Sequence, residues 1–142
     1  MKSMQILVDT NVILDWIMKR EPFVTIATKI MKQCIDGKIT GYLASHTLPD
    51  LFYILRKKFS VEQRKELVLL LCDRFFIIPE DNKIMVSAAK NELWNDFEDG
   101  LQMQCALDKN LDYIITQNIK DFATSEVKAV LPEAFIKILE TA

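Results

Sequence analysis

The segment that decides the fold reads Ile6-Leu7-Val8-Asp9-Thr10-Asn11. Consecutive apolar residues are typical of a strand buried on both faces of a parallel sheet, and the polar residues after them stand at its carboxyl end. Apolar residues also meet acidic or amide side chains at Asp96-Phe97-Glu98-Asp99-Gly100 and Tyr113-Ile114-Ile115-Thr116-Gln117-Asn118-Ile119-Lys120-Asp121-Phe122. Open α/β folds bind ligands at the carboxyl edge of the sheet. We therefore expect these distant segments to meet at one edge.

The composition predicts one compact domain. The chain has 142 residues, 50% of them hydrophobic, and its three glycines and four prolines leave little sequence for a linker. No apolar run approaches the roughly 20 residues of a membrane span, and the amino terminus lacks a signal-peptide pattern. We expect a soluble, cytoplasmic protein without membrane association, in which residues 1–142 form a single domain.

Cysteine and histidine usage argues against disulfides and zinc-type sites. Cys34, Cys72 and Cys105 are odd in number and lie among apolar residues, so we predict that all three are reduced core residues. His46 is the only histidine and cannot supply a histidine cluster for zinc or iron. A serine hydrolase triad is also disfavoured, and we predict a capping or loop role for Ser45 and His46.

Hydrophobic periodicity predicts strands and helices in alternation. Expected strands are 5–8, 39–44, 75–78, 112–116 and 127–130, and expected helices are 12–19, 21–36, 47–55, 60–73, 82–94, 101–109 and one from Pro132. We expect Asn11 to cap the first helix, and Thr47 with Asp50 to form part of a capping box. Strands that alternate with helices imply a mostly parallel sheet covered on both faces, a three-layer α/β/α sandwich.

Each acidic residue also has a purely structural interpretation. Asp9 could accept backbone hydrogen bonds at a helix start, and Asp50 could complete its capping box. Asp96, Glu98 and Asp99 could form a solvated acidic turn that opens a helix, and Asp121 could pair with Lys120 or a nearby base. Their combination favours a metal site, because two carboxylates about 5 Å apart repel by roughly 3 kcal/mol at an effective dielectric constant near 20. A divalent cation offsets that repulsion, and oxygen ligands select Mg²⁺ or Mn²⁺.

Three motifs carry a family resemblance. They read Leu7-Val8-Asp9-Thr10-Asn11-Val12-Ile13-Leu14-Asp15, Asp96-Phe97-Glu98-Asp99-Gly100-Leu101-Gln102 and Ile115-Thr116-Gln117-Asn118-Ile119-Lys120-Asp121-Phe122. Together, and in this order over nearly the whole chain, they resemble the PIN-domain ribonucleases, and most of all the VapC-type toxins. The resemblance implies a single PIN-like domain, a sheet of about five strands in the order 3-2-1-4-5, and a metal-dependent nuclease site.

The resemblance assigns the metal-binding acids residue by residue. It implies Asp9 as the first acid and Asp99 as the third. Asp50 stands where the family usually has a glutamate, and its side chain is one methylene shorter. Asp121 is the expected charged group of the last motif, and Asp96 is expected in the outer shell.

Three polar residues complete the expected site. The resemblance implies Asn11 as a positioning residue beside Asp9, and Thr116 and Asn118 as hydrogen-bonding groups for the water or the phosphate. Asn118 carries an amide where some relatives carry an acid. The implied activity is an endoribonuclease in which one or two Mg²⁺ or Mn²⁺ ions orient a water for in-line attack on an RNA phosphodiester, which leaves a 3′-hydroxyl and a 5′-phosphate. The resemblance further implies a homodimer and, for a toxin, an antitoxin protein whose peptide would block the acidic groove.

Two other functions stay open. A small phosphohydrolase or a receiver domain also places aspartates at strand ends, although Asp9-Thr10-Asn11 lacks the second acid two residues on that a phosphatase would use. A catalytically weak PIN scaffold would bind RNA or protein without cutting, and the departures at Asp50 and Asn118 allow it.

The overall charge does not indicate a nucleic-acid binder. The net charge is −2 and the isoelectric point is about 5.4, whereas nucleic-acid-binding proteins usually carry a basic field. Local basic groups could form a rim for phosphates, and three aromatic residues could stack on bases; these are Lys19-Arg20, Arg56-Lys57-Lys58, Arg64-Lys65 and Lys120, with Trp16, Phe52 and Tyr53. An ordinary solvated surface is the alternative.

Overall fold

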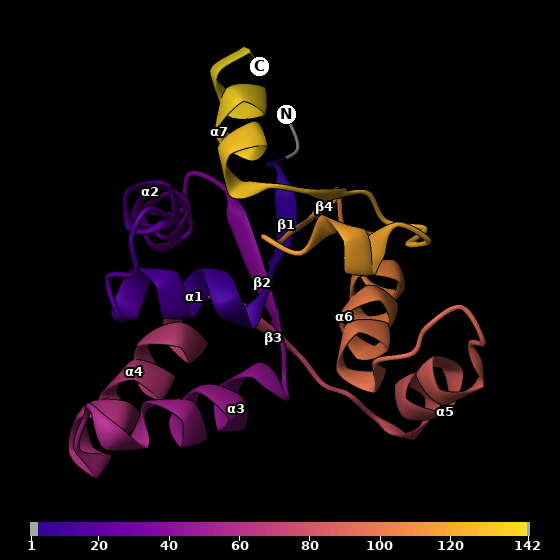
Figure 1. Cartoon of the computed structure of the whole chain (residues 1–142), viewed down its shortest axis with the longest axis horizontal. Helices are drawn as coiled ribbons and strands as arrows, with labels where there is room; N and C mark the ends of the chain where they lie inside the picture. Colours follow the sequence, from indigo (N-terminus) through magenta and orange to yellow (C-terminus); the bar gives the residue numbers. More distant parts are fainter. Residues whose placement is uncertain (1–2, 142) are drawn as a thin grey trace.

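The computed structural model describes residues 3–141, and within them a five-stranded sheet forms the centre of the molecule (Figure 1). The strands are β1 (Gln5–Val8), β2 (Thr40–Ala44), β3 (Phe76–Ile78), β4 (Tyr113–Ile115) and β5 (Ala129–Val130), in the order β3-β2-β1-β4-β5. Every pairing between neighbours is parallel. The predicted parallel sheet and its strand order are confirmed.

The central strand β1 fixes the position of Asp9. Ile6, Leu7 and Val8 have no exposed surface, because β2 and β4 flank β1 in the sheet and helices cover both faces. Val8 pairs with Ile115, and the N–H of Asp9 donates to the carbonyl of Ile115 at 3.0 Å. Asp9 therefore leaves the sheet beside the end of β4. The chain leaves β1 between its two neighbouring strands, which is the place where open α/β sheets form a ligand crevice.

Helices cover both faces of the sheet. One face carries α1 (Thr10–Ile17), α2 (Val24–Ile35), α3 (Thr47–Ile54), α4 (Val61–Arg74) and α7 (Pro132–Thr141), and the other carries α5 (Asn82–Lys90) and α6 (Phe97–Asp108). Ile6 and Val8 belong to the first core and Leu7 to the second, as the two-residue period of a strand requires. Short 3₁₀ helices follow α3 (η1, Leu55–Lys57) and β4 (η2, Ile119–Phe122). The predicted three layers are confirmed.

Two predicted helix caps are wrong. α1 begins at Thr10, so Asp9 rather than Asn11 holds the cap position, and the Asp9 side chain makes no capping hydrogen bond. Thr47 lies inside α3, and its hydroxyl is 3.0 Å from the hydroxyl of Thr10, so it does not form the capping box expected with Asp50. The side chains of Asp9 and Thr47 therefore contact residues from other segments and do not cap their own helices.

Other boundaries shift by a few residues. α2 begins at Val24 and α5 ends at Lys90, inside the predicted ranges. α6 begins at Phe97, four residues earlier than predicted, so Asp96 caps that helix and the acidic residues after it form its first turn. Within residues 3–141, no helix is both long and apolar enough to cross a membrane.

The prediction for the cysteines is correct at two positions. Cys34 and Cys105 are buried free thiols, whereas Cys72 is an exposed one. The helix that carries Cys72, α4, buries only Leu67 and Leu71, and its remaining apolar residues reach the surface to different degrees. The apolar run around Cys72 is therefore a poor guide to its burial.

Candidate metal centre

A polar cleft of about 270 Å³ lies at the carboxyl edge of the sheet. Its walls come from the start of α1, the β2–α3 turn and α3, the beginning of α6, and the segment after β4. Its acidic side chains are Asp9, Asp50, Asp96, Glu98, Asp99 and Asp121, and its other polar side chains are Thr10, Asn11, His46, Gln102 and Asn118. A larger groove of about 490 Å³ between α1 and α4 is mostly apolar and contains none of these residues. The acidic cleft is therefore the place where the predicted segments meet.

The structure brings the predicted site residues together. The cleft is lined by Asp9, Asn11, Asp50, Asp96, Asp99, Asn118 and Asp121. Thr116 is fully buried behind the cleft wall and contacts Asp9. The binding of a metal and the part that each residue takes in catalysis stay predictions.

Asp9 is the most deeply placed acid of the cleft, with 8% of its surface exposed. The Thr116 hydroxyl donates to Oδ2 of Asp9 at 2.9 Å, and Nε2 of Gln102 donates to Oδ1 at 3.4 Å. Burial raises the pKa of Asp9, the hydrogen bond from Thr116 opposes that effect, and the charge of Asp121 adds to it. Both side-chain donors are neutral, and the charge of His46 also lowers the pKa of Asp9.

Asp99 and Asp96 share the beginning of α6. The carboxylate of Asp96 accepts the backbone N–H of Asp99 at 3.0 Å and so caps the helix. The pKa of Asp99 is raised to about 6, first by burial and then by repulsion from Asp96, Asp121 and Asp9. Asp96 thus has a structural role as well as a place in the cleft. Asp9, Asp96 and Asp121 therefore place further negative charge close to Asp99.

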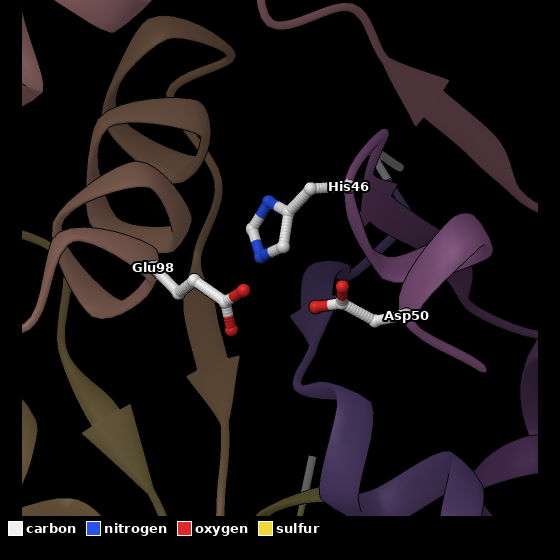
Figure 2. Close-up of side chains that lie close together, drawn as sticks. All are labelled: His46, Asp50 and Glu98. Carbon is white, nitrogen blue, oxygen red and sulfur yellow. The ribbon is translucent and has the colours of Figure 1, made fainter. Parts of the chain in front are cut away.

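His46, Asp50 and Glu98 form a second group in the same cleft. One potential ligand atom from each lies within 4.8 Å of the other two (Figure 2). Burial raises the pKa of Glu98 and repulsion by Asp50 adds to the shift, while the charge of His46 opposes it. Among residues 3–141, the carboxylates of Asp9, Asp99 and Asp121 do not converge as closely as this group.

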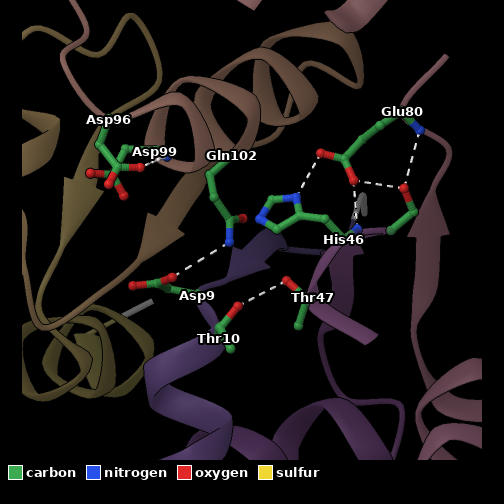
Figure 3. A network of polar contacts seen from close by, with 9 residues as sticks. Asp9, Thr10, His46, Thr47, Glu80, Asp96, Asp99 and Gln102 are labelled. Carbon is green, nitrogen blue, oxygen red and sulfur yellow. Dashed lines mark hydrogen bonds and ion pairs between the residues drawn. The ribbon is translucent and has the colours of Figure 1, made fainter. Parts of the chain in front are cut away.

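Glu80 anchors His46 from behind. The side chain of Glu80 is 2% exposed, and its Oε2 accepts a hydrogen bond from Nδ1 of His46 at 2.6 Å (Figure 3). Its Oε1 accepts the backbone N–H of His46 at 2.5 Å and the hydroxyl of Ser45 at 2.7 Å. The predicted loop role is correct for Ser45, because it ties the β2–α3 turn to the residue after Pro79. His46 shares that role and also reaches the cleft.

The His46–Glu80 contact shifts both pKa values toward the charged forms. Burial lowers the pKa of His46, but the hydrogen bond to Glu80 and the charges of Glu80, Glu98 and Asp50 outweigh it, so the pKa is raised. Burial raises the pKa of Glu80, but the hydrogen bonds from His46 and Ser45 outweigh it, so the pKa is lowered. The imidazole therefore favours its cationic form.

Sequence reasoning missed five residues of this site: Thr10, His46, Glu80, Glu98 and Gln102. Gln102 follows Asp99 by three residues in a helix, and this spacing places both on one face, so it could have been found. Glu98 was included only in a solvated turn. Glu80 carries no local signal, because it reaches His46 through the pairing of β3 with β2.

Two arginines of the predicted basic rim already contact other residues of the chain. The guanidinium of Arg64 lies 4.3 Å from the ring centre of Phe52 and donates to the Phe52 carbonyl at 2.7 Å. The guanidinium of Arg56 lies 3.8 Å from the ring centre of Tyr53, which is 63% exposed. Lys120 lines a small polar cleft that adjoins the acidic one. Base stacking on these aromatic residues stays a prediction.

The sequence profile of the PIN domain matches residues 5–120. The chain belongs to the PIN-domain family. The matched segment runs from β1 to the start of η2 and includes every predicted site residue except Asp121, which follows its end directly. Membership in the PIN family supports a nuclease role. Comparison with curated protein sequences finds no match to the chain.

Solved structures share the PIN fold. VapBC2 from Rickettsia felis, bound to a promoter DNA fragment, is 19% identical with a TM-score of 0.68, over 90% of this chain and 98% of that one. A toxin-antitoxin complex from Klebsiella pneumoniae is 24% identical with a TM-score of 0.67, over 89% and 96%. VapBC-1 from nontypeable Haemophilus influenzae is 21% identical with a TM-score of 0.66, over 92% and 99%. These likenesses confirm the predicted PIN fold with its VapC-type resemblance. The single-domain organisation of residues 1–142 stays a prediction.

Proposed function

We propose that this PIN domain is a divalent-metal-dependent endoribonuclease that hydrolyses RNA phosphodiesters. The observation that carries the proposal is the gathering of Asp9, Asp99 and Asp121 in one cleft, where, among residues 3–141, none of them forms an ion pair with a basic side chain. Their repulsion contributes to the elevated pKa of Asp99, about 6. Carboxylate oxygens with amide and hydroxyl neighbours are the donor set that Mg²⁺ and Mn²⁺ prefer. The side chains of the cleft therefore fit such an ion.

The residues of the cleft would have different roles in the proposed reaction. A divalent ion, when bound, supplies an acidified water and positive charge beside a phosphate. Asp9, Asp99 and Asp121 would hold the ion, with Asp50 as a further carboxylate on the opposite wall. Thr116 orients the Asp9 carboxylate through its 2.9 Å hydrogen bond.

Two exposed amides stand at the rim of the same cleft, on Asn11 and Asn118. Their N–H groups can donate to phosphate oxygens and so position the RNA backbone. Hydrolysis of the bond to the 3′ oxygen would leave a 3′-hydroxyl and a 5′-phosphate.

We also propose that the chain is the toxin of a toxin–antitoxin pair. The similar structure from Klebsiella pneumoniae is a toxin-antitoxin complex. An antitoxin peptide with a basic side chain would fit the acidic cleft, since it would neutralise the carboxylates that the RNA-cleaving state needs. Co-expression of a short neighbouring reading frame should relieve growth arrest caused by the chain, and failure of every neighbouring protein to do so would contradict the pairing.

A homodimer and a cytoplasmic location stay predictions. The helix α4 leaves Val61, Leu69 and Leu70 exposed, with Leu69 at 69%, and these side chains could contribute to a dimer contact. Sedimentation at several protein concentrations would test for the dimer.

Cleavage of a panel of labelled single-stranded and hairpin RNAs tests the nuclease proposal. The wild-type protein should cut with Mg²⁺ or Mn²⁺ and not with chelator. Asp99→Asn should reduce cutting by at least about 100-fold, because it removes a metal-binding oxygen anion. Asp73→Asn is the matched control, since that side chain is 74% exposed on α4 and distant from the cleft. An Asp99→Asn variant that is folded and fully active overturns the site, and RNA binding in chelator without cutting in any metal would favour a binding scaffold.

A further inference from the structure

The strongest unexplained arrangement in the molecule surrounds its single histidine. His46 projects from the β2–α3 turn toward Asp50 on α3 and Glu98 on α6 (Figure 2). One ligand atom of each residue lies within 4.8 Å of the others. The carboxylates of Asp50 and Glu98 approach each other from two different helices, and the imidazole points between them.

Glu80 decides which nitrogen of His46 faces the cleft. Because a carboxylate only accepts, Nδ1 of His46 is the donor in the 2.6 Å hydrogen bond to Oε2 of Glu80. Nε2 is then the nitrogen directed at Asp50 and Glu98. A buried carboxylate behind Nδ1 is the arrangement that orients metal-binding imidazoles and raises their basicity.

A second observation points to a ligand at the same place. Gln102 is 2% exposed, and its Nε2 is committed to Asp9, whereas its Oε1 is buried with no hydrogen-bond partner. Figure 3 shows the Gln102 amide between Asp9 and His46, with the oxygen on the side of His46. A buried acceptor without a donor costs about 1–3 kcal/mol. A water bound to an ion at His46 would supply that donor.

We propose that Nε2 of His46 and the carboxylates of Asp50 and Glu98 bind a divalent transition-metal ion such as Zn²⁺, in a second site beside the magnesium site. One imidazole and two carboxylates form a donor set that favours zinc and its neighbours, whereas the all-oxygen set around Asp9 and Asp99 favours Mg²⁺. Zinc holds such ligands at about 2.0–2.2 Å, so their atoms lie roughly 3–4 Å apart. Glu98 is exposed, so its side chain has room for the change of rotamer that this spacing would require.

The second site changes the role of Asp50. The inference deepens the proposed function, because both ions would share one cleft, and it assigns Asp50 to the ion beside His46. Glu80 is a positioning residue for the imidazole, and it makes no contact with the ion.

Nuclear magnetic resonance of the intact protein tests the site, because His46 is the only histidine in 142 residues. The metal-free protein, labelled with ¹⁵N-histidine, is titrated with Zn²⁺ while calorimetry gives the affinity and stoichiometry. We expect the Nε2 resonance to move to the shift of a zinc-bound nitrogen while Nδ1 stays protonated. Zinc binding that leaves the Nε2 resonance unchanged overturns the proposal.

Variants separate this site from the magnesium site. Glu98→Gln should weaken the Zn²⁺ affinity measured at His46 by at least about tenfold. Glu133→Gln, exposed on α7, is the control and should not change it. Asp99→Asn should leave the Nε2 shift intact. An unaltered zinc affinity in folded Glu98→Gln overturns the ligand set. Coordination without RNA cleavage would contradict the proposed nuclease alone, and cleavage without coordination would contradict the second site alone.

Discussion

The two ends of the acidic cleft differ in how their negative charge is balanced. At one end, Asp9 accepts hydrogen bonds from the neutral side chains of Thr116 and Gln102, and burial with the neighbouring acids raises the pKa of Asp99 to about 6. At the other end, Asp50 and Glu98 face the imidazole of His46, whose pKa is raised by its hydrogen bond to Glu80 against the effect of burial. In the proposed function, a divalent cation would balance the acids of the first end. At the second end, a bound metal ion would take the place of a proton on Nε2 of His46.

The two ends also arise differently in the fold. Asp9 and Thr116 follow paired strands directly, so the register of β1 with β4 sets their distance. His46 and Glu80 are 34 residues apart and meet because β2 lies beside β3. The first end depends on the most buried part of the sheet, and the second depends on side-chain contacts near its edge. The position of the Asp9 carboxylate is therefore fixed by the sheet and does not depend on a bound ion.

Magnesium binding at the first end should raise the free energy of unfolding by more than any single substitution at the second end lowers it. At a free Mg²⁺ concentration 100 times its dissociation constant, the free energy of unfolding should rise by about 2.7 kcal/mol. Asp9→Asn should abolish most of this gain, because it removes the charge that the ion balances, and Asp73→Asn should keep it. Urea unfolding with and without Mg²⁺ measures the effect. Equal stabilisation of wild type and Asp9→Asn would remove Asp9 from the site.

Glu80→Gln should be the most damaging single change at the second end. It replaces a buried anion that accepts hydrogen bonds from His46 and Ser45, and a hydrogen bond to a charged group contributes about 2 kcal/mol. We expect a loss of about 2 kcal/mol in the free energy of unfolding and a lower pKa for His46. Glu133→Gln on the surface of α7 should stay within about 0.5 kcal/mol of wild type. A His46 pKa that does not fall in Glu80→Gln would show that the pair is not the source of its shift.

The first end and Asp50 could be predicted from sequence, whereas the contact between His46 and Glu80 could not, for a physical reason. Asp9, Asp99 and Asp121 each stand beside an apolar run or at a helix start, so the local pattern and the family motifs together indicate where they lie. The contact between His46 and Glu80 has no local pattern, because it needs the strand order before the two residues can be placed together. From sequence alone, the single histidine therefore indicates a loop, and Glu80 cannot be identified as its partner.

The same limit explains the wrong caps. Thr47 has the sequence context of a helix cap, but its hydroxyl lies 3.0 Å from the hydroxyl of Thr10, 37 residues away, and a tertiary contact replaced the local one. Cys72 shows the reverse case, since its apolar neighbours predict burial although α4 packs through Leu67 and Leu71. Local patterns located the elements, and contacts between elements decided what individual side chains do.

Thr116→Val should have an intermediate effect at the first end. Valine keeps the shape of threonine but loses the donor to Asp9 and the acceptor for the N–H of Asn118 at 3.0 Å. We expect a loss of about 1 kcal/mol in stability and a roughly tenfold loss of cleavage, with the Asp9 carboxylate less well oriented. Thr25→Val on the exposed side of α2 is the control. Full activity in Thr116→Val would show that Asp9 needs no orienting hydroxyl.

The pH dependence of stability should be the smallest effect, and it should reverse when a metal is added. In the metal-free protein, Asp9, Glu98 and Asp99 have pKa values raised above those of the unfolded chain, so between about pH 4 and pH 6 the folded state binds more protons and the free energy of unfolding falls as pH rises. The raised pKa of His46 extends this fall in the free energy of unfolding above pH 6.5. The lowered pKa of Glu80 has the opposite effect, but only below about pH 4.5.

Because Asp99 is partly solvated, we expect the free energy of unfolding to change by less than about 1 kcal/mol per pH unit. With saturating Mg²⁺ the slope should become flat or positive, since the ion binds deprotonated carboxylates. Denaturant unfolding at pH 5, 6 and 7 decides the point, and identical slopes with and without Mg²⁺ would mean that the acids of the cleft do not bind the ion.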